Sequence, residues 1–307
     1  MYDIIIVGAG PAGMTAALYA LRANKKVLIL EAKAYGGQIL TANKVENYPA
    51  IKEISGYDYS ENLYNQIIDL GVEYKNEIVV NVSQDLKVTT NKDTYEGKAI
   101  IIASGASNRK LGLHNEEELT GKGISYCATC DGNFYKNKIV AVNGGGNTAV
   151  EDAIYLSNIA RKVYLIHRRD EFRAERKYLR EIRSKDNIEV ITNSTITKIT
   201  GNDKLESIDI SNNDDGTTTT LKVDGLFVAI GQEPKNEIFT DVADIDDKGY
   251  FISEDGVHTK TPLVYIAGDA RQKVLRQLTT AVSDGSIAAV MAIREIGENE
   301  SNWIKWK

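Results

Sequence analysis

Two stretches of the chain share one order of apolar and polar positions. In the first, an apolar run at 4–7 leads into a glycine-rich loop, and a second apolar run follows at 27–30. Apolar residues recur every three or four positions between them, at Met14, Ala17, Leu18 and Leu21. A short apolar run bounded by turn residues predicts a buried strand, and the recurrence predicts a helix. Residues 4–30 therefore predict a strand, a loop, a helix and a second strand.

The same unit recurs further along the chain. A strand is predicted at 138–142, a helix with Val150, Ala153 and Ile154 on one face, and a second strand at 163–166. The two loops read Gly8-Ala9-Gly10-Pro11-Ala12-Gly13 and Gly144-Gly145-Gly146-Asn147-Thr148-Ala149. One such loop is weak evidence, because similar strings occur in unrelated turns. Its duplication at matched spacing indicates two dinucleotide-binding units.

Glycines in such a loop allow a tight turn and a close approach of the backbone, so that a pyrophosphate binds at the helix N-terminus. We expect these contacts from Gly8, Gly10, Pro11, Ala12 and Gly13 in the first unit, and from Gly144, Gly146, Asn147 and Thr148 in the second.

The residue at the tip of each second strand distinguishes the two units. Glu31 stands 23 residues after Gly8, where a carboxylate accepts hydrogen bonds from ribose hydroxyls. The position 23 residues after Gly144 holds His167, followed by Arg168, Arg169 and Arg173. Arginines suit a ribose 2′-phosphate, which glutamate would repel. We therefore predict FAD in the first unit and NADPH in the second. The alternative for the arginines is a solvated basic face.

Three further apolar strands place additional residues. One at 100–106 contains Ala103, and one at 226–231 ends before Pro234. The third, at 263–267, leads to Gly268 and Asp269, and a helix with Leu278 on its apolar face follows. A strand that ends in Gly-Asp places a carboxylate at the edge of the sheet where ligands of α/β proteins bind. The alternative is a helix-capping aspartate.

These elements predict an α/β fold with two Rossmann-like three-layer dinucleotide-binding domains, of which the NADPH-binding domain is inserted into the FAD-binding domain. We expect a discontinuous FAD-binding domain at 1–112 and 245–307 and an NADPH-binding domain at 113–244 that carries the redox dithiol. The polar, glycine-containing segment 107–123 suits a linker.

Composition narrows the class of protein. A net charge of −6 and a pI of about 5.3 give no reason to expect binding to nucleic acid or to anionic membranes. The longest uninterrupted apolar run, 287–293, is far shorter than the ~18 residues of a membrane-spanning helix. Because 2–7 already reads as a buried strand, we expect no signal peptide and a cytoplasmic location.

The chain has only two cysteines, Cys127 and Cys130, at C-x-x-C spacing. A metal site would need two more ligands, and the only histidines, His114, His167 and His258, are scattered, so no metal is expected. A static structural disulfide would be unusual in a cytosolic protein. The spacing therefore favours a redox-active pair. Asp131 is then a candidate proton donor to a departing thiolate, or simply a turn former.

The dithiol precedes the strand at 138–142, whereas the second glycine loop follows it. We therefore expect dithiol and dinucleotide towards opposite ends of this strand, which spans ~17 Å. Since both must reach one flavin, we predict that the small domain pivots about a linker at Gly121 and Gly123.

The motifs Cys-Ala-Thr-Cys-Asp-Gly at 127–132, Thr-Ala-Val-Glu at 148–151 and His-Arg-Arg-Asp-Glu-Phe-Arg at 167–173 closely resemble those of low-molecular-weight thioredoxin reductases. Gly36-Gly37-Gln38, Glu46-Asn47-Tyr48-Pro49, Gly268-Asp269 and Arg276-Gln277 match the flavin-side motifs of that family. The resemblance covers about residues 2–290.

The resemblance implies a homodimer with one FAD per chain and thioredoxin as the partner. It implies that Cys130 faces the isoalloxazine, that Cys127 attacks the disulfide of thioredoxin and that Asp131 acts as the acid. FAD contacts are implied for Gly37, Gln38, Thr41, Asn47, Ala103, Gly268, Asp269, Arg276, Gln277 and Leu278. Ile230 and Gly231 would line the NADPH cleft. Asn143, Ala50 and Ser104 depart from the usual residues, and Asn143 stands on the nicotinamide side.

Four alternatives share part of this pattern. A reductase of a peroxidase component typically carries an N-terminal redox extension, and ferredoxin–NADP reductases lack the dithiol. Flavin-only reductases fed by ferredoxin would lack the second loop and its arginines. A non-catalytic redox sensor would not need both loops and a dithiol. Another small disulfide carrier as the partner stays open.

Overall fold

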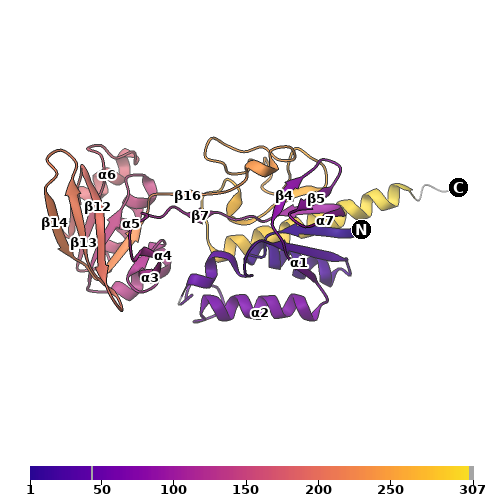
Figure 1. Cartoon of the computed structure of the whole chain (residues 1–307), viewed down its shortest axis with the longest axis horizontal. Coiled ribbons are helices and arrows are strands. Elements are labelled where there is room, and N and C mark those ends of the chain that lie inside the picture. The colour runs from indigo at the N-terminus through magenta and orange to yellow at the C-terminus, as the bar shows by residue number, and fades with distance from the viewer. Residues whose placement is uncertain (43, 304–307) are drawn as a thin grey trace. The chain divides into compact units, whose positions relative to one another are not determined.

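A computed structural model describes residues 1–42 and 44–303, with only the backbone described at Thr41 and at 299–303. The chain divides into two compact units. Unit 1 consists of Met1–Ser107 and Glu233–Lys307, and unit 2 consists of Asn108–Gln232, so unit 2 interrupts unit 1 in sequence (Figure 1). Among the described residues, no helix is both long and apolar enough to cross a membrane.

Unit 1 is built on a seven-stranded sheet in the order β3-β2-β1-β6-β5-β4, with β17 also paired to β6. The strands are β1 (Tyr2–Val7), β2 (Val27–Glu31), β3 (Glu73–Asn76), β4 (Val79–Val82), β5 (Lys87–Thr90), β6 (Thr94–Ile102) and β17 (Val264–Ile266). Strands β3, β2, β1, β6 and β17 pair in parallel, whereas β4 and β5 add an antiparallel edge.

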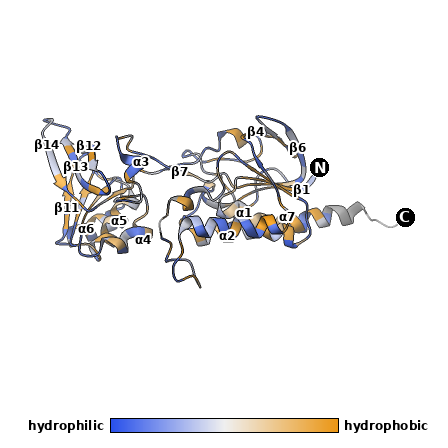
Figure 2. Cartoon of the chain, turned by 60° about the horizontal axis from the view of Figure 1, so that its bottom comes forward, coloured by the Kyte–Doolittle hydropathy of each residue, from blue (hydrophilic) through white to orange (hydrophobic). Residues whose placement is uncertain are grey.

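The alternation of side chains along β1 explains the layers of unit 1. Ile4 and Ile6 pack towards the helices α1 (Pro11–Arg22), α2 (Gly56–Asp69) and α7 (Leu278–Trp303). Ile5 faces the opposite layer, where Val88 of β5 and Phe239 of the short helix η3 (Glu237–Phe239) belong to the same core. Figure 2 shows the hydrophobic residues concentrated in the strands around β1, with mixed faces on the helices.

Unit 2 has a five-stranded parallel sheet in the order β11-β10-β9-β15-β8. Its strands are β8 (Ile124–Ser125), β9 (Ile139–Asn143), β10 (Lys162–Ile166), β11 (Ile188–Ile191) and β15 (Gly225–Val228). One face carries α4 (Ala128–Asp131), η2 (Gly132–Tyr135), α5 (Asn147–Ser157) and α6 (Arg176–Arg183). The other carries α3 (Glu116–Leu119) and an antiparallel sheet of β12 (Ser194–Gly201), β13 (Leu205–Asn212) and β14 (Thr218–Lys222). The predicted pair of three-layer α/β domains is thus confirmed.

The chain passes between the units at β7 (Ser107–Asn108) and β16 (Gln232–Glu233), which pair with each other. The structure therefore divides the chain earlier than the predicted boundaries after residues 112 and 244. The segment after 232 belongs to unit 1 because Phe239, Val242 and Ala243 are buried in its core.

The predicted linker at 107–123 is wrong. Glu116 is 2% exposed, and its carboxylate accepts hydrogen bonds from the backbone N–H groups of Leu111 and Gly112, at 2.8 Å each. Gly123 is buried, and a Cβ atom added there would lie 2.3 Å from Leu205 Cβ. Gly121 and Gly123 therefore lie inside unit 2 and do not form a hinge. The predicted pivot itself stays a prediction.

Candidate active site

The two glycine loops have the same backbone construction. The N–H of Gly8 donates to Leu30 O at 2.8 Å, and the N–H of Gly144 donates to Ile166 O at 3.0 Å. A Cβ atom at Gly8 would lie 2.3 Å from Ala103 O, and one at Gly144 would lie 2.3 Å from Ala229 O. Each first glycine is thus required by a carbonyl at the end of the neighbouring strand.

The third residue of each loop, Gly10 or Gly146, has free space beside its Cα atom. A Cβ atom at either would meet nothing within 4 Å, and both residues stand at the N-cap of a helix, α1 and α5. Glycine has no side chain to cap these helices, so their first N–H groups are available to a ligand. Both loops therefore suit the pyrophosphate predicted from the sequence, with Pro11 and Ala12 in the first turn of α1 and Asn147 and Thr148 in that of α5.

Glu31 lies beside the first loop, as its spacing predicts. Its Oε2 accepts a hydrogen bond from the N–H of Ala9 at 2.7 Å, and its Oε1 accepts one from the N–H of Lys33 at 2.8 Å. A carboxylate oxygen accepts more than one hydrogen bond, so a ribose hydroxyl fits beside these amides. The carboxylate also fixes the loop itself.

Unit 2 replaces this arrangement with a buried ring. His167 is 5% exposed and stacks on Phe172 at a centroid distance of 5.0 Å, and a Cβ atom at Gly145 would lie 2.1 Å from the His167 ring. Burial, with smaller effects of Arg173, Arg169 and Arg168, holds the pKa of His167 below its usual value despite a hydrogen bond to Glu171 O. His167 is therefore a neutral packing group under the loop. That His167 belongs to the NADPH site stays a prediction, and the arginines beside it remain the predicted partners of the 2′-phosphate.

The arginines lie on a segment that is tied to the second loop. The N–H of Arg173 donates to Gly145 O at 2.8 Å, and Asn147 and Glu175 exchange two hydrogen bonds, at 2.9 and 3.0 Å. The guanidinium-bearing residues Arg168, Arg169 and Arg173 are all exposed. Three exposed cations beside a helix N-terminus suit a doubly charged phosphate. The sequence indicated the arginines but not the paired hydrogen bonds between Asn147 and Glu175.

The remaining flavin-side residues converge on the first loop of unit 1. A Cβ atom at Gly37 would lie 3.2 Å from Gly10 Cα, and one at Gly268 would lie 2.9 Å from Ala12 Cβ. Gln38, on the short helix η1 (Gly37–Thr41), donates from its amide to Ala106 O, four residues beyond the end of β6, just after the turn that carries Ala103. The side chain of Thr41 lies outside the described residues.

A second group of flavin-side residues gathers around Arg276 and Gln277, just before α7. Asn47 Nδ2 donates to Gln277 Oε1 at 3.0 Å, and Leu278 is the first residue of α7. Arg276 lies over the Tyr250 ring at 4.0 Å and donates to Asp269 O at 3.3 Å. The segments 47, 250, 269 and 276–278, which are far apart in sequence, therefore meet in unit 1.

Asp269 carries an oxygen that suits a ligand hydroxyl. It stands in the turn η4 (Gly268–Ala270), and burial raises the pKa of its carboxyl group against the opposing effect of Lys273. The buried Asp269 Oδ1 lies 3.2 Å from Lys273 Nζ, with which it forms an ion pair. A carboxylate oxygen accepts more than one hydrogen bond, so a ligand hydroxyl fits beside this ammonium group.

A buried charge cluster that the sequence analysis missed supports this turn. Asp284 of α7 accepts two hydrogen bonds from Arg271, at 2.8 Å each, one from Lys273 at 3.0 Å, and one from the N–H of Gly268 at 3.1 Å. The fully buried Asn236 donates to Ala270 O at 2.9 Å and accepts from Ser104 at 2.8 Å. Neither residue lies in a recognisable local motif, because their contacts depend on the tertiary fold.

In unit 2, Cys127 and Cys130 form a disulfide with a Cα–Cα distance of 5.3 Å. Both are half-buried, and Cys127 stands at the N-cap of α4. Asp131 ends that helix, and its Oδ2 accepts a hydrogen bond from Ser125 Oγ at 2.6 Å. Burial raises the pKa of Asp131, and the bond from Ser125 opposes this effect. A carboxyl group with a raised pKa beside a disulfide is suited to give up and take back a proton.

The predicted separation of dithiol and dinucleotide loop along the strand is wrong. Strand β8 runs parallel to β15 and hence to β9, with Ser125 level with Phe227 and Val142. Cys127 therefore lies level with Gly144, at the same carboxyl edge of the sheet. One strand separates β8 from β9, so their backbones are ~10 Å apart. The sequence suggested otherwise because β8 is a two-residue strand that its apolar pattern does not reveal.

The same edge holds the remaining residues expected to contact NADPH. Ile230 and Gly231 directly follow the turn after β15, and the carbonyl of Gly231 accepts a hydrogen bond from the N–H of Arg109 at 3.0 Å. Gly231 has a φ of 109°, which favours glycine. Asn143, the departure noted in the sequence, is half-buried at the end of β9.

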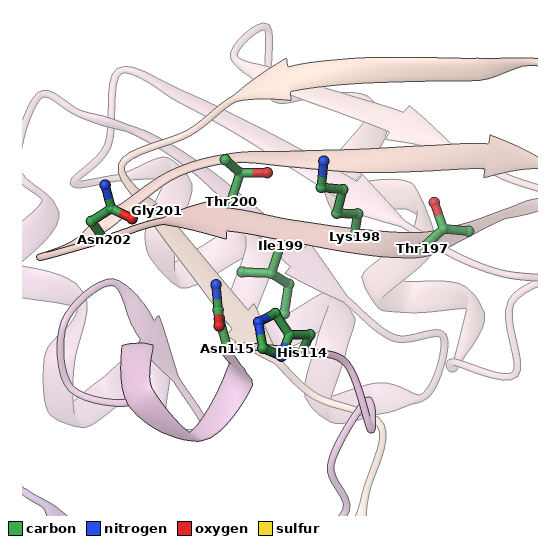
Figure 3. Close-up of a pocket in the computed structure, with 8 residues that line it drawn as sticks. All are labelled: His114, Asn115, Thr197, Lys198, Ile199, Thr200, Gly201 and Asn202. Atoms are coloured by element: carbon green, nitrogen blue, oxygen red, sulfur yellow. The ribbon is translucent and has the colours of Figure 1, made fainter.

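A cavity elsewhere in unit 2 does not belong to this site. It has a volume of about 230 Å³ and is lined by His114, Asn115 and residues 197–202. Figure 3 shows His114 and Asn115, from the loop before α3, beside Ile199 of β12. None of the predicted site residues lines it. Within the described ranges, no group of three or more His, Cys, Asp or Glu side chains has the geometry of a metal site.

Comparison with known proteins agrees with this geometry. Residues 2–285 match the model of the family described as pyridine nucleotide-disulphide oxidoreductase. The chain is 42% identical over 299 residues to a "34.2 kDa protein in rubredoxin operon" of Clostridium pasteurianum, covering 96% of this chain and 97% of that protein. It is 41% identical over 302 residues to a thioredoxin reductase of Listeria monocytogenes, covering 97% of this chain and 95% of the relative.

A solved structure shares the fold over the same range. The crystal structure of thioredoxin reductase from Streptococcus pyogenes superposes with a TM-score of 0.92 at 40% sequence identity. The match covers 97% of this chain and 99% of that one. Both units of the fold described above are therefore included in the similarity.

Proposed function

Because the chain belongs to the pyridine nucleotide-disulphide oxidoreductase family, we propose that it is an NADPH-dependent thioredoxin-disulfide reductase containing FAD. Electrons pass from NADPH through FAD to the Cys127–Cys130 disulfide and then to oxidised thioredoxin. The observation that carries this proposal is the redox pair with a half-buried acid of raised pKa beside it, in a chain that builds two dinucleotide loops on one plan.

Unit 1 is proposed to hold FAD. Its first loop, from Gly8 to Gly13, would take the pyrophosphate, Glu31 would take the ribose, and Asp269 would accept a ligand hydroxyl beside Lys273. Gly37, Gln38, Thr41, Asn47, Ala103 and Arg276 to Leu278 complete the set. When bound, FAD supplies the step between two-electron hydride chemistry and thiol chemistry.

Unit 2 is proposed to hold NADPH. The loop from Gly144 to Thr148 would take the pyrophosphate, and Arg168, Arg169 and Arg173 would take the 2′-phosphate. His167 would hold the loop in place from below. Ile230 and Gly231 would line the nicotinamide part of the cleft. Because the dithiol lies at the same edge of the sheet, one unit carries both the donor site and the acceptor pair.

The thiol exchange follows from the arrangement around Asp131. In the reduced protein, the Cys127 thiolate attacks the disulfide of thioredoxin, so that a mixed disulfide forms and one thioredoxin sulfur leaves with the bonding electron pair. Asp131 gives its proton to that leaving thiolate. The Cys130 thiolate then attacks Cys127, which re-forms the internal disulfide and releases the second thioredoxin sulfur, which takes a proton from water.

Steady-state reduction of oxidised thioredoxin with NADPH tests this proposal. We expect turnover in the natural protein and loss of at least about three orders of magnitude when Cys127 or Cys130 becomes serine, since a covalent intermediate is removed. The variants should keep FAD and bind NADPH. Reduction of a different small disulfide protein but not of thioredoxin would redirect the proposal to another carrier or peroxidase component.

We infer further that the protein is a cytoplasmic homodimer. The use of both cysteines as a redox pair supports a reducing compartment. Ile287 and Val290, one turn apart on α7, are about half exposed and suit an interface between copies. Sedimentation equilibrium of the FAD-loaded protein tests the assembly state, and a monomer at micromolar concentration would refute it.

A further inference from the structure

Ser125 connects the two functional parts of the dithiol site. It is 3% exposed and ends strand β8. Its Oγ accepts a hydrogen bond from the N–H of Cys127 at 3.1 Å and lies 2.6 Å from Asp131 Oδ2. The carbonyl oxygen of Cys127 lies 3.3 Å from the same Oγ. One buried hydroxyl therefore contacts the acid and both backbone groups of the attacking cysteine.

The hydroxyl has one hydrogen and two acceptors within reach. At 2.6 Å, the bond to the carboxylate has the length of a charge-assisted O–H···O⁻ bond, whereas 3.3 Å to the carbonyl is long for a hydroxyl donor. Ser125 thus donates to Asp131 while that carboxylate is ionised. Once Asp131 carries a proton, its own O–H donates to Ser125 Oγ, and the serine hydrogen turns to the Cys127 carbonyl.

We propose that Ser125 is a positioning residue that sets the proton affinity of Asp131 and couples its protonation to the backbone of Cys127. This inference rests on the proposed role of Asp131 as the acid of the thiol exchange. The hydrogen bond from Ser125 stabilises the ionised carboxylate, so it makes Asp131 a stronger acid. It also keeps Cys127 at a fixed place relative to the acid in both protonation states.

Other titratable groups near the acid do not replace this contact. Tyr135, on η2, has its pKa raised to about 12 by burial and then by Asp131 and Asp224, so it stays neutral. On α5, Tyr155 and Leu156 pack against Gly132, and Asp152 lies on the same face one turn earlier. Burial, with Glu151, raises the pKa of Asp152 to about 7. The hydrogen bond from Ser125 is the contact that lowers the pKa of Asp131 against the effect of burial.

The titration of the Asp131 carboxyl carbon by NMR in FAD-loaded protein tests the proposal without turnover. The Asp131→Asn variant identifies the signal. In Ser125→Ala we expect the pKa of Asp131 to rise by about one pH unit, the effect of losing one hydrogen bond to a charged group. Ser125→Thr restores the hydroxyl and should restore the titration. An unchanged or lower pKa in Ser125→Ala would overturn the proposal.

A matched serine and a kinetic measurement separate this role from a general loss of structure. Ser157 is also buried in unit 2, where it donates to Ile154 O at 2.7 Å, and Ser157→Ala should leave the Asp131 titration unchanged. In thioredoxin reduction, Ser125→Ala should move the alkaline limb of the pH profile up by the same one unit and lower kcat several-fold, with Ser125→Thr recovering both. If the natural protein reduces no thioredoxin but the pKa of Asp131 still rises in Ser125→Ala, the proposed function is refuted while the role of Ser125 toward Asp131 holds.

Discussion

The two dinucleotide units use one backbone plan with different chemistry at the tip of the second strand. In unit 1 the Glu31 carboxylate accepts the N–H of Ala9, whereas in unit 2 the ring of His167 occupies the space that a side chain at Gly145 would need. The strand, turn and neighbouring carbonyl agree in both, down to Ala103 O and Ala229 O. The loop backbone is therefore common to both sites, and the tip residue determines which nucleotide each one suits.

This difference has an electrostatic consequence. A carboxylate at the ribose end excludes a further phosphate, while a buried neutral imidazole adds no charge and leaves the exposed arginines to act. The exchange of glutamate for histidine also explains why the middle loop residue is alanine in unit 1 and glycine in unit 2. Sequence and packing change together at these two positions.

The largest effect is expected from closing the first turn of a loop. Gly8 has a φ of 104°, and a methyl group there would meet Ala103 O, so Gly8→Ala should destabilise unit 1 by about 3 kcal/mol or more and abolish FAD retention. Gly10→Ala is the matched control, since nothing lies within 4 Å of its Cβ position. It should unfold like the natural apoprotein in urea yet retain less FAD. Equal free energies of unfolding for both variants would contradict the role given to the Ala103 carbonyl in requiring glycine at position 8.

A second effect concerns the ring under the second loop. Gly145→Ala places a methyl group against His167, and such overpacking costs about 1–3 kcal/mol. Adding His167→Ala should relieve most of this cost, so the double variant should be more stable than the sum of the two single variants predicts. Urea unfolding of the four proteins gives the coupling energy. Strict additivity would show that the ring and the loop are independent.

The third effect is on coenzyme preference. Replacing Arg168, Arg169 or Arg173 singly by alanine should lower the ratio of kcat/KM for NADPH over NADH roughly tenfold, about 1.4 kcal/mol, because one charge-assisted contact to the 2′-phosphate is lost. Arg180, exposed on α6 of the same unit, is the control and should leave the ratio unchanged. If all four variants keep the natural ratio, the basic segment is only a solvated face.

The smallest effect distinguishes the histidines of the two units. In unit 1, partial burial acts to lower the pKa of His258, but hydrogen bonds to Glu295 and Asp255 together raise it. Its contribution to the stability of unit 1 is about 1 kcal/mol or less, because the site is partly exposed. This contribution is present below pH ~6.5 and is lost as the pH rises through the raised pKa. His167 in unit 2 has a lowered pKa, so its contribution is lost as pH falls below ~6.5.

Hydrogen exchange measured separately for each unit gives the direction in which the stability of each changes with pH. From pH ~6 to pH ~8, unit 1 should lose a little protection against global opening, and His258→Gln should remove that loss. Unit 2 should change in the opposite direction over the acidic half of the range. The same sign of pH dependence for both histidines would contradict the burial and contacts described for them.

The sequence predicted well wherever local pattern and geometry coincide. The strand–loop–helix–strand units, the loop glycines and Glu31 follow from spacing, since each contact is made within one supersecondary unit. The position of the dithiol could not be predicted from spacing, because the two-residue strand β8 gains its register only by pairing with β15. The packing of the His167 ring against Gly145 could likewise not be predicted, since charge patterning does not reveal it.

Residues that act across long sequence separations could not be predicted at all. Asp284, Lys273 and Asn236 support the Gly268–Asp269 turn from α7 and from irregular chain, with partners up to 132 residues away. The earlier division of the units has the same cause, since the burial of Phe239 decides which unit the segment after 232 joins. Such contacts exist only once the whole unit has folded.

The measurement that tests the central claim most directly is the flavin absorbance of FAD-loaded protein mixed anaerobically with NADPH or with NADH, followed by oxidised thioredoxin. Two loops sorted by their tip residues predict that NADPH bleaches the flavin at least about ten times faster than NADH, and that thioredoxin restores the oxidised spectrum. Flavin that stays oxidised with both coenzymes would contradict the assignment of NADPH to unit 2, and the electron donor would have to be sought elsewhere.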